Sequence, residues 1–413
     1  MKNSLESLFT RGISIASKFL LLGYLAKNLS LDDYGSFQLI SYFVLISTTI
    51  FGLEYYNITN RNIAQATEKK QIYNEHFSFF FTIAPFVLIA QVLLFLIVFP
   101  NELITSVNVV LVLVIGLCDY FSQEVYRYLM INKSFRIGNI QLIYKSLLFV
   151  VLIVIYKVFF GALTFEIVLW IMLVSYILLF IIAYRGFIRT LHTFTSSMFT
   201  RMSSEQLKLS LKAIFPFVVL IIFLKGIEFS DKFIIGKLLS LEDTGIYSFL
   251  FSIASVIHIF IVSGFYIIYL PQLIQSFADN KKIFISELKK FGLLTLVSSI
   301  SLAIVIPLIS PFIFGLIDKE AFIAHIDLLY IFLLGFVFNN LSLIPHLFLY
   351  VSHDERAITV IMAVSFIINL GLNLVLIPKF GILGAAYSFM VTYFTVLLLK
   401  LLRAQFKWRE IKV

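Results

Sequence analysis

Long apolar runs separated by short polar breaks occupy this chain of 413 residues from end to end. A helix needs about 20 apolar residues to cross the hydrocarbon of a bilayer, and twelve runs reach or approach that length. The runs cover residues 8–27, 35–56, 77–99, 107–128, 138–156, 166–184, 213–238, 245–270, 291–315, 326–350, 357–377 and 382–402. This pattern predicts an all-α integral membrane protein with twelve transmembrane helices.

The composition agrees with a membrane protein. Hydrophobic residues make up 60% of the chain and charged residues only 13%, whereas soluble domains are roughly 25% charged. The single cysteine, Cys118, excludes an intramolecular disulfide. We expect no cleaved signal peptide, because Lys18 interrupts the first apolar run and eleven further runs follow it.

The distribution of Lys and Arg predicts the orientation. If both termini are cytoplasmic, 23 basic residues lie at the cytoplasmic ends of the spans. Five lie outside: Lys27, Lys157, Lys237, Lys319 and Lys379. This bias fits the positive-inside rule. The formal net charge of +9 therefore reflects membrane topology, not nucleic-acid binding.

Two similar segments suggest an internal repeat. Residues 31–37 read LDDYGSF and residues 241–247 read LEDTGIY, and the pairs Arg136/Arg356 and Gly161/Gly381 echo each other at a similar offset. Parallel repeats of this kind occur in transporters. We predict two six-helix pseudo-symmetric lobes, 1–205 and 206–413, joined by a cytoplasmic linker over residues 185–212; chance similarity between apolar helices is the alternative.

Charged residues inside the predicted spans are the candidate functional groups. A Lys at the centre of a lipid-facing helix costs about 2.5 to 3.5 kcal/mol, so such residues should face a cavity. The candidate substrate-binding cations are Arg11, Lys18, Arg127, Lys145, Lys225 and Lys232. The candidate coupling groups or charge partners are Glu54, Asp119, Glu124, Glu228 and Asp231. The polar residues for helix packing or cavity lining are Asn339, Asn369 and Asn373.

Each group also has a structural explanation. Arg127 and Glu54 lie near enough to a membrane interface to extend towards water. Asp119, Glu228 and Asp231 are also explained as structural partners of nearby cations. His258 and His346 are more typical of interhelical hydrogen bonds than of proton transfer.

No catalytic motif stands out in the sequence. It contains no Gly-rich phosphate loop, no HExxH, no paired cysteines and no nucleophile elbow. We therefore expect no enzyme activity, no cofactor and no bound metal. Transport would draw on an ion gradient or on the gradient of the substrate.

Four short motifs carry a family resemblance. They are DDYG at 32–35, DKFIIG at 231–236, GIYS at 245–248 and NLGLNLVLIPKFGILGAA at 369–386, where we expect a helix to end at Pro378 and the chain to turn at Gly381. Together they resemble Wzx-type lipid-linked oligosaccharide flippases of the multidrug/oligosaccharidyl-lipid/polysaccharide (MOP) superfamily. The last two motifs are the distinctive ones.

The resemblance implies a two-lobed exporter of the bacterial inner membrane. It would move undecaprenyl-pyrophosphate-linked oligosaccharide units outward for O-antigen or capsular polysaccharide assembly, by alternating access through a cationic cavity. Its partners would be membrane lipids and the polymerase and glycosyltransferases of the same pathway. Two alternatives remain: a multidrug or cation antiporter of the same fold, and a membrane-embedded glycan polymerase or ligase, which normally needs a larger outer loop.

Overall fold

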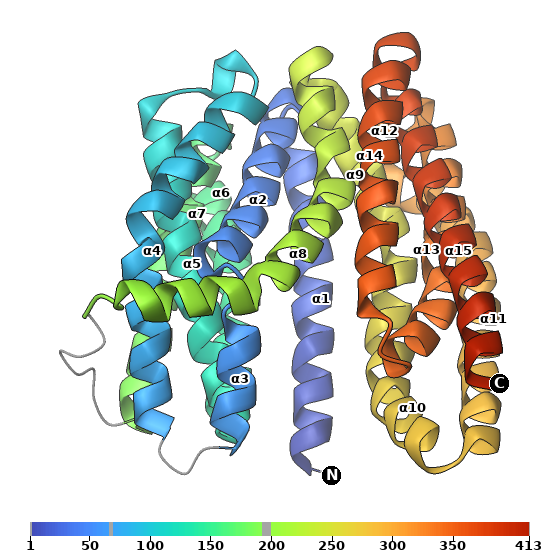
Figure 1. Ribbon diagram of the computed structural model, residues 1–413. Coiled ribbons are helices and arrows are strands. Elements are labelled where there is room, and N and C mark those ends of the chain that lie inside the picture. Colours follow the sequence, from blue (N-terminus) through green and yellow to red (C-terminus); the bar gives the residue numbers. More distant parts are fainter. Residues whose placement is uncertain (1, 66–68, 192–199, 413) are drawn as a thin grey trace. The chain divides into compact units, whose positions relative to one another are not determined.

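The structure, a computed structural model, describes residues 2–65, 69–191 and 200–412, and throughout these ranges it contains helices and no strands (Figure 1). The long helical segments are α1 (Lys2–Asn28), α2 (Leu31–Gly52), α4 (Lys69–Val98), α5 (Ser106–Ile131), α6 (Phe135–Phe160), α7 (Phe165–Leu191), α8 (Ser204–Leu238), α9 (Leu241–Ile261) continued by α10 (Ile267–Asp279), α11 (Lys281–Ile317), α13 (Ile326–Val351), α14 (Glu355–Phe380) and α15 (Ile382–Lys412). The short ones are α3 (Tyr56–Gln65), η1 (Asn101–Leu103) and α12 (Glu320–Ala324).

Eleven of these helical segments are long and apolar enough to cross a membrane; α1 is the long helix that does not meet this criterion. The chain is thus a multi-pass membrane protein, and the predicted all-α fold is confirmed. Each predicted apolar run falls within or close to one long helical segment. The run at 245–270 continues to Asp279, because a π-helical turn at Val262–Tyr266 connects α9 to α10 without a break.

Two predicted boundaries are wrong. The expected linker at 185–212 is largely helical, since α7 continues to Leu191 and α8 begins at Ser204; its residues 192–199 lie outside the described ranges. The helix expected to end at Pro378 continues to Phe380. A proline in the last turn removes one backbone hydrogen bond without forcing the helix to end there. The actual stop is Gly381, whose φ of +61° suits glycine.

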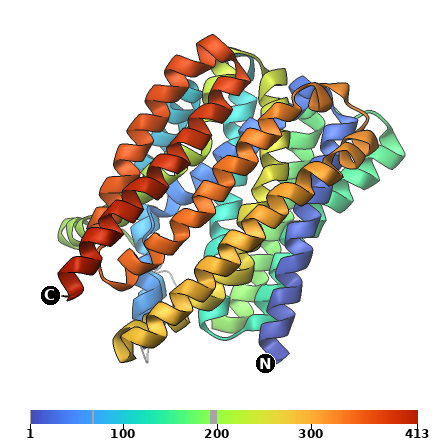
Figure 2. The same cartoon turned by 90° about the vertical axis from the view of Figure 1, so that its right-hand side faces the viewer.

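The chain divides into two compact units, residues 1–218 and 219–413, with the boundary inside α8. In the first unit α1 packs on α6, α2 on α5, and α5 and α6 on α7. In the second unit α13 packs against α9, α11 and α15, and α14 packs on α15 (Figures 1 and 2). Apolar side chains fill both units, for example around Phe77 and Tyr128 in the first and Phe284 and Phe348 in the second.

The two echoing turns have the same local geometry. Ser30 caps α2 by accepting a hydrogen bond from the Asp33 amide at 3.1 Å, and Ser240 caps α9 by accepting one from the Asp243 amide at 2.9 Å. Such N-caps stabilise a helix by about 1 kcal/mol. Pseudo-symmetry of lobes divided at 205/206 stays a prediction.

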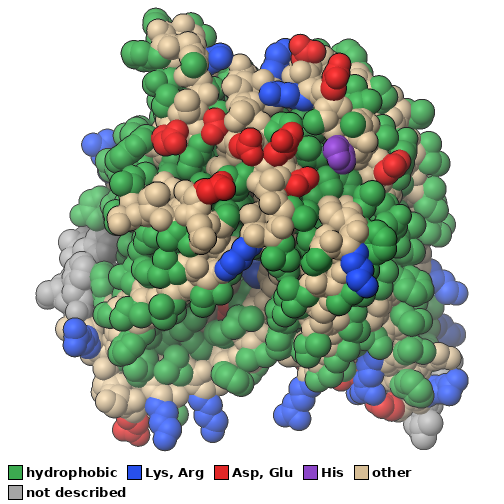
Figure 3. Space-filling view, turned by 90° about the horizontal axis from the view of Figure 1, so that it is seen from above, with side chains coloured by type: hydrophobic (Ala, Val, Ile, Leu, Met, Phe, Trp, Pro, Cys, Tyr) green, Lys and Arg blue, Asp and Glu red, His purple; other side chains and the backbone are tan. Residues whose placement is uncertain are grey.

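Local features also recur around the second set of echoing positions, Arg136/Arg356 and Gly161/Gly381. Gly161 and Gly381 both end helices with positive φ, and the turns after α5 and α13 contain Lys133 at φ +60° and His353 at φ +58°. Many acidic side chains are visible on the surface in the end-on view of Figure 3.

Candidate functional site

Helix α5 positions a buried acid against a cation from α6. Asp119 is fully buried, forms an ion pair with Lys145 of α6, and accepts a hydrogen bond of 2.9 Å from Gln123. The Lys145 side chain is 31% exposed. Lys145 therefore connects α6 to α5 as the partner of Asp119, while part of its side chain remains exposed.

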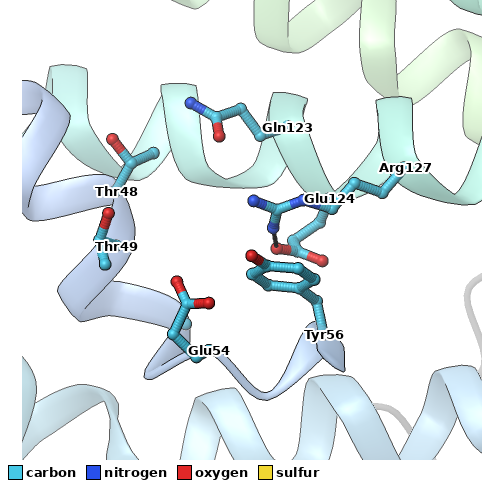
Figure 4. Close-up of a pocket in the computed structure, with 8 residues that line it drawn as sticks. Thr48, Thr49, Glu54, Tyr56, Gln123, Glu124 and Arg127 are labelled. Atoms are coloured by element: carbon cyan, nitrogen blue, oxygen red, sulfur yellow. Dashed lines mark hydrogen bonds and ion pairs between the residues drawn. The ribbon is translucent and has the colours of Figure 1, made fainter. Parts of the chain in front are cut away.

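A small polar pocket lies where α2 ends and the chain turns into α3, against α5. Its lining residues are Thr48, Thr49, Gly52, Glu54, Tyr56, Gln123, Glu124 and Arg127 (Figure 4). The space between these side chains is about 230 Å³ with the part open to solvent included, far too little for a sugar repeat unit. The pocket brings together three predicted site residues, Glu54, Glu124 and Arg127.

Backbone geometry positions Glu54 at the pocket. Leu53 and Glu54 both have left-handed φ values, 42° and 59°. Residues other than glycine rarely adopt this conformation, and it often marks functional sites. The turn directs the Glu54 carboxylate towards the pocket, where it accepts a hydrogen bond of 2.9 Å from Asn57.

Arg127 is held between an acid and an aromatic ring. Its guanidinium donates to Glu124 Oε1 and lies 3.7 Å from the centroid of the Tyr56 ring. Figure 4 shows the three side chains side by side at the pocket. Burial, followed by the charge of Glu54, raises the pKa of Tyr56 to about 12. Tyr56 is therefore a neutral phenol at physiological pH. Asp119, Gln123 and Arg127 are spaced i, i+4, i+8 and so share one face of α5, but Arg127 pairs with Glu124 instead of with Asp119.

The sequence analysis missed His76, which lies behind the pocket on α4. Its side chain is 1% exposed, and its Nε2 lies 3.4 Å from Glu124 Oε2. Its Nδ1 is 3.0 Å from the Thr59 hydroxyl. His76 precedes the predicted span at 77–99 by one residue, so its position alone suggested an interfacial residue.

In the second unit, Lys232 lies in the core and not along a cavity. It is fully buried, with its ammonium 2.9 Å from Asp231 Oδ1 and 2.8 Å from the Glu228 carbonyl oxygen. The ammonium also lies 3.7 Å from the centroid of the Phe251 ring. Tyr247 donates a 2.5 Å hydrogen bond to Asp231 Oδ2. In this conformation the Lys232 ammonium is not available to a substrate.

Lys225 is more accessible. It forms an ion pair of 2.7 Å with Glu228, and the two side chains are 28% and 44% exposed. On α1, the side chain of Lys18 is exposed, while that of Arg11 lies outside the described residues. Ser14, which shares a helix face with Arg11 and Lys18 by its spacing in the sequence, accepts a 2.5 Å hydrogen bond from Ser146 of α6.

A second missed residue is Lys400 of α15, which the charge count placed at the cytoplasmic surface. It is 6% exposed, and its ammonium makes no hydrogen bond or ion pair within the described residues. Its charge acts on His346 and His258. His346 Nδ1 is itself buried without a hydrogen-bond partner among the described groups. Since Lys400 lies inside the predicted span 382–402, the sequence did contain a signal for it.

The amides of α14 form a buried network. Asn369 accepts from Ser230 and Asn373, each at 3.1 Å, and donates to Thr392 of α15 at 3.1 Å. Asn339 is only partly buried. Its neighbour Asn340 is fully buried instead, 2.7 Å from His258 Nδ1.

No family model matches the sequence, and no curated protein is significantly similar to it. Solved structures do share its fold. A lipid II flippase MurJ in an inward closed conformation superposes with a TM-score of 0.71 at 15% identity, covering 98% of this chain and 87% of that one. An inward-facing multidrug resistance MATE family transporter of the MOP superfamily gives 0.71 at 12% identity, covering 98% and 95%.

A MOP superfamily transporter from Pyrococcus furiosus, described as having a binding pocket of reverse polarity, gives a TM-score of 0.57 at 14% identity, covering 99% and 95%. At these identities the likeness establishes the fold alone. The chain has the fold of MOP-superfamily transporters, and these structural neighbours are transporters and flippases, not enzymes.

Proposed function

We propose that this protein is a flippase that moves undecaprenyl-pyrophosphate-linked oligosaccharide units outward across the bacterial inner membrane, for O-antigen or capsular polysaccharide assembly. Support comes from the fold it shares with a lipid II flippase and from the Wzx-like motifs. Both termini would be cytoplasmic. Transport would proceed by alternating access and be coupled to an ion gradient.

The observation that carries this proposal is an imbalance among buried charges. Each of the fully buried acids Asp119, Glu124 and Asp231 already has a cationic partner. The buried Lys400 has no acidic partner among the described residues. A buried cation without a counter-ion is costly, and an anionic substrate such as a pyrophosphate would supply that counter-ion.

Lys400 and Lys225 are the groups we assign to the pyrophosphate in the second unit. Arg127 and Lys145 are the corresponding candidates in the first unit, and Lys18 and Arg11 remain proposed contributors on α1. Lys232 would act by stabilising Asp231. The prenyl chain would stay in lipid, because only the charged and sugar-bearing part needs a polar route.

The test compares two lysines on the same helix. In a host that depends on this chain for surface glycan, Lys400→Gln should reduce export at least tenfold at near-normal protein level, and lipid-linked oligosaccharide should accumulate inside. Lys407→Gln is the matched control, because Lys407 is 23% exposed and already pairs with Glu410. Wild-type export by Lys400→Gln would contradict the assignment.

A multidrug or cation antiporter is the second candidate, favoured by the equal TM-score of the inward-facing MATE transporter. Purified protein in liposomes separates the two functions. Uptake of organic cations against a proton or sodium gradient, without movement of a lipid-linked oligosaccharide, would favour the antiporter.

A further inference from the structure

One exposed face of α11 changes from basic to apolar along the helix. The first part of this face carries four exposed polar side chains, Lys282, Ser286, Lys289 and Lys290. The part that follows carries apolar side chains that are 38% to 62% exposed, Leu293, Leu296, Val297 and Ile300. Spacings of 7, 11 and 18 residues from Lys282 keep Lys289, Leu293 and Ile300 on one side of a helix with 3.6 residues per turn. No charged residue occurs from 291 to 317, so the apolar part of the face is suited to lipid, and the basic part continues it.

The α10–α11 hairpin holds this basic part in a defined position. Figures 1 and 2 both show the hairpin extending past the α13–α14 turn and past the end of α15 at the same end of the second unit. Ring contacts join its two helices, with centroids 5.1 Å apart for Phe277 and Phe284. Asn280 caps α11 by accepting a hydrogen bond of 2.9 Å from the Lys282 amide. The lysines therefore project from a packed and capped helix.

The length of α11 places the lysines near the lipid headgroups. Lys290 precedes the end of the helix at Ile317 by 27 residues, or about 40 Å along the axis. The hydrocarbon of a bilayer is about 30 Å thick, and the bilayer with its headgroups about 40 to 45 Å. Lys289 and Lys290 thus lie just beyond the hydrocarbon. Lys282 lies two turns further, and its long side chain can extend back towards the headgroups.

No acidic side chain in the described part of the chain neutralises these three lysines, since none of them forms an ion pair there. The acid of the same stretch, Glu287, is only partly exposed, and its Oε2 is buried without a hydrogen-bond partner among the described groups. The exposed face of α11 therefore keeps its full positive charge.

Membrane topology alone explains basic residues at this end of the spans, but it does not explain their surroundings. On α15, Arg403 pairs with Asp354 at 2.6 Å and Lys407 pairs with Glu410 at 3.3 Å. The lysines of α11 differ from these in two ways. They have no acidic partner, and they continue a face suited to lipid. Both differences favour an anionic lipid as the partner of α11.

We propose that Lys282, Ser286, Lys289 and Lys290, the basic patch, bind the phosphate of an anionic phospholipid. Ser286 lies at the centre of the patch, because residues three and four positions apart are neighbours on a helix surface. A phosphate over Ser286 would accept a hydrogen bond from its hydroxyl and charge-assisted hydrogen bonds from the ammonium groups. The acyl chains would pack on the apolar face from Leu293 onward. This lipid lies beside the protein and is separate from any transported substrate, so the site does not depend on the proposed function.

The first experiment measures lipid binding to the full-length protein in detergent by native mass spectrometry. The two probes are phosphatidylglycerol, which is anionic, and phosphatidylcholine, which has no net charge. The wild type should bind phosphatidylglycerol more tightly. Lys289→Gln combined with Lys290→Gln should lower that affinity about 25-fold, because each basic residue near an anionic membrane surface contributes about fivefold. Binding of phosphatidylcholine should not change.

The matched control is Lys281→Gln combined with Lys407→Gln, which removes two charges from the same end of the second unit. Lys281 lies about 140° around the helix axis from Ser286, and Lys407 already pairs with Glu410. This variant should lose less than about fivefold in affinity for phosphatidylglycerol, less than one patch lysine contributes. Equal binding of both lipids by the wild type would overturn the site. An equal loss in the two double variants would overturn it as well, because net charge and not the patch would then attract the lipid.

The second experiment tests whether lipid covers this face. A spin label at Leu293→Cys, in a Cys118→Ala background and in nanodiscs that contain phosphatidylglycerol, should collide with oxygen, which concentrates in hydrocarbon, and not with a water-soluble nickel complex. Asp279→Cys, at the exposed end of α10, is the water-exposed reference. Nickel access at Leu293 equal to that at Asp279 would show that the face lies in water. Protection of Leu293 from both reagents would show that protein, such as a second copy of this chain, covers it. Either result would overturn the phospholipid site.

Discussion

Replacing Lys232 should damage stability before it damages transport. Lys232→Met removes the ammonium that lies 2.9 and 3.1 Å from the two oxygens of Asp231. The Asp231 side chain is 2% exposed, so its carboxylate would be left buried with the Tyr247 hydroxyl and the Lys232 amide as its remaining donors among the described residues. We expect a loss of about 3 to 5 kcal/mol in the free energy of unfolding, the range found when one partner of a buried ion pair is removed.

Removing both charges should cost much less. In the double variant Asp231→Asn with Lys232→Met no buried charge remains, and buried pairs are often replaceable by neutral groups of similar volume. The single variants and the double variant form a cycle whose interaction energy should exceed about 1 kcal/mol, because the residues are in contact. Lys225→Met is the matched control. It breaks the exposed pair with Glu228 and should cost at most about 1 kcal/mol.

Unfolding of the purified protein in mixed micelles, followed by circular dichroism as denaturing detergent is added, measures these differences. Surface glycan, normalised to the amount of folded protein, separates stability from transport. The reasoning is refuted if Lys232→Met is as stable as the wild type and yet exports nothing. That combination would make Lys232 a substrate contact despite its burial.

Two further predictions concern packing and orientation. Gly384→Leu should sharply lower the yield of monodisperse protein in size-exclusion chromatography, because a Cβ there would lie 2.2 Å from the Leu376 carbonyl oxygen; Gly371→Leu, where nothing lies within 4 Å, should behave like wild type. A fluorescent reporter that folds only in the cytoplasm, fused to the C-terminus, should be bright, and a periplasm-active enzyme in the same place should be silent; the reverse result would invert the proposed topology.

The helices were predictable because the information for them is local. Twenty apolar residues in a row specify a transmembrane helix wherever they occur, and Ser30 and Ser240 cap their helices through bonds to residues three positions away. Boundaries were less predictable, since the helices continue past the apolar runs into polar sequence. Pro378 illustrates this: it suggested a stop, but the backbone continued to the glycine that could adopt positive φ.

The partners of the charged residues were not predictable, because they depend on which helices touch. Asp119 and Lys145 lie on different helices, and His76 and Glu124 meet across α4 and α5. Helical spacing places Asp119 and Arg127 on one face of α5, but Arg127 forms its ion pair with a neighbouring acid, Glu124. Helical spacing indicates which residues share a face and leaves open which neighbouring side chain each of them contacts.

Lys400 shows why depth matters as much as spacing. It follows the start of α15 at Ile382 by 18 residues, or about 27 Å along a helix axis, close to the hydrocarbon thickness of about 30 Å. In the proposed orientation this depth is the inner edge of the membrane, where a lipid-linked pyrophosphate in the cytoplasmic leaflet would lie.

Lys225 precedes the outer end of α8 at Leu238 by 13 residues, about 20 Å, and therefore lies closer to the middle of the membrane than Lys400. The two lysines would then contact the pyrophosphate in sequence, Lys400 at entry and Lys225 during passage. A Lys400 variant should therefore lose substrate binding, whereas a Lys225 variant should bind the substrate and fail to move it.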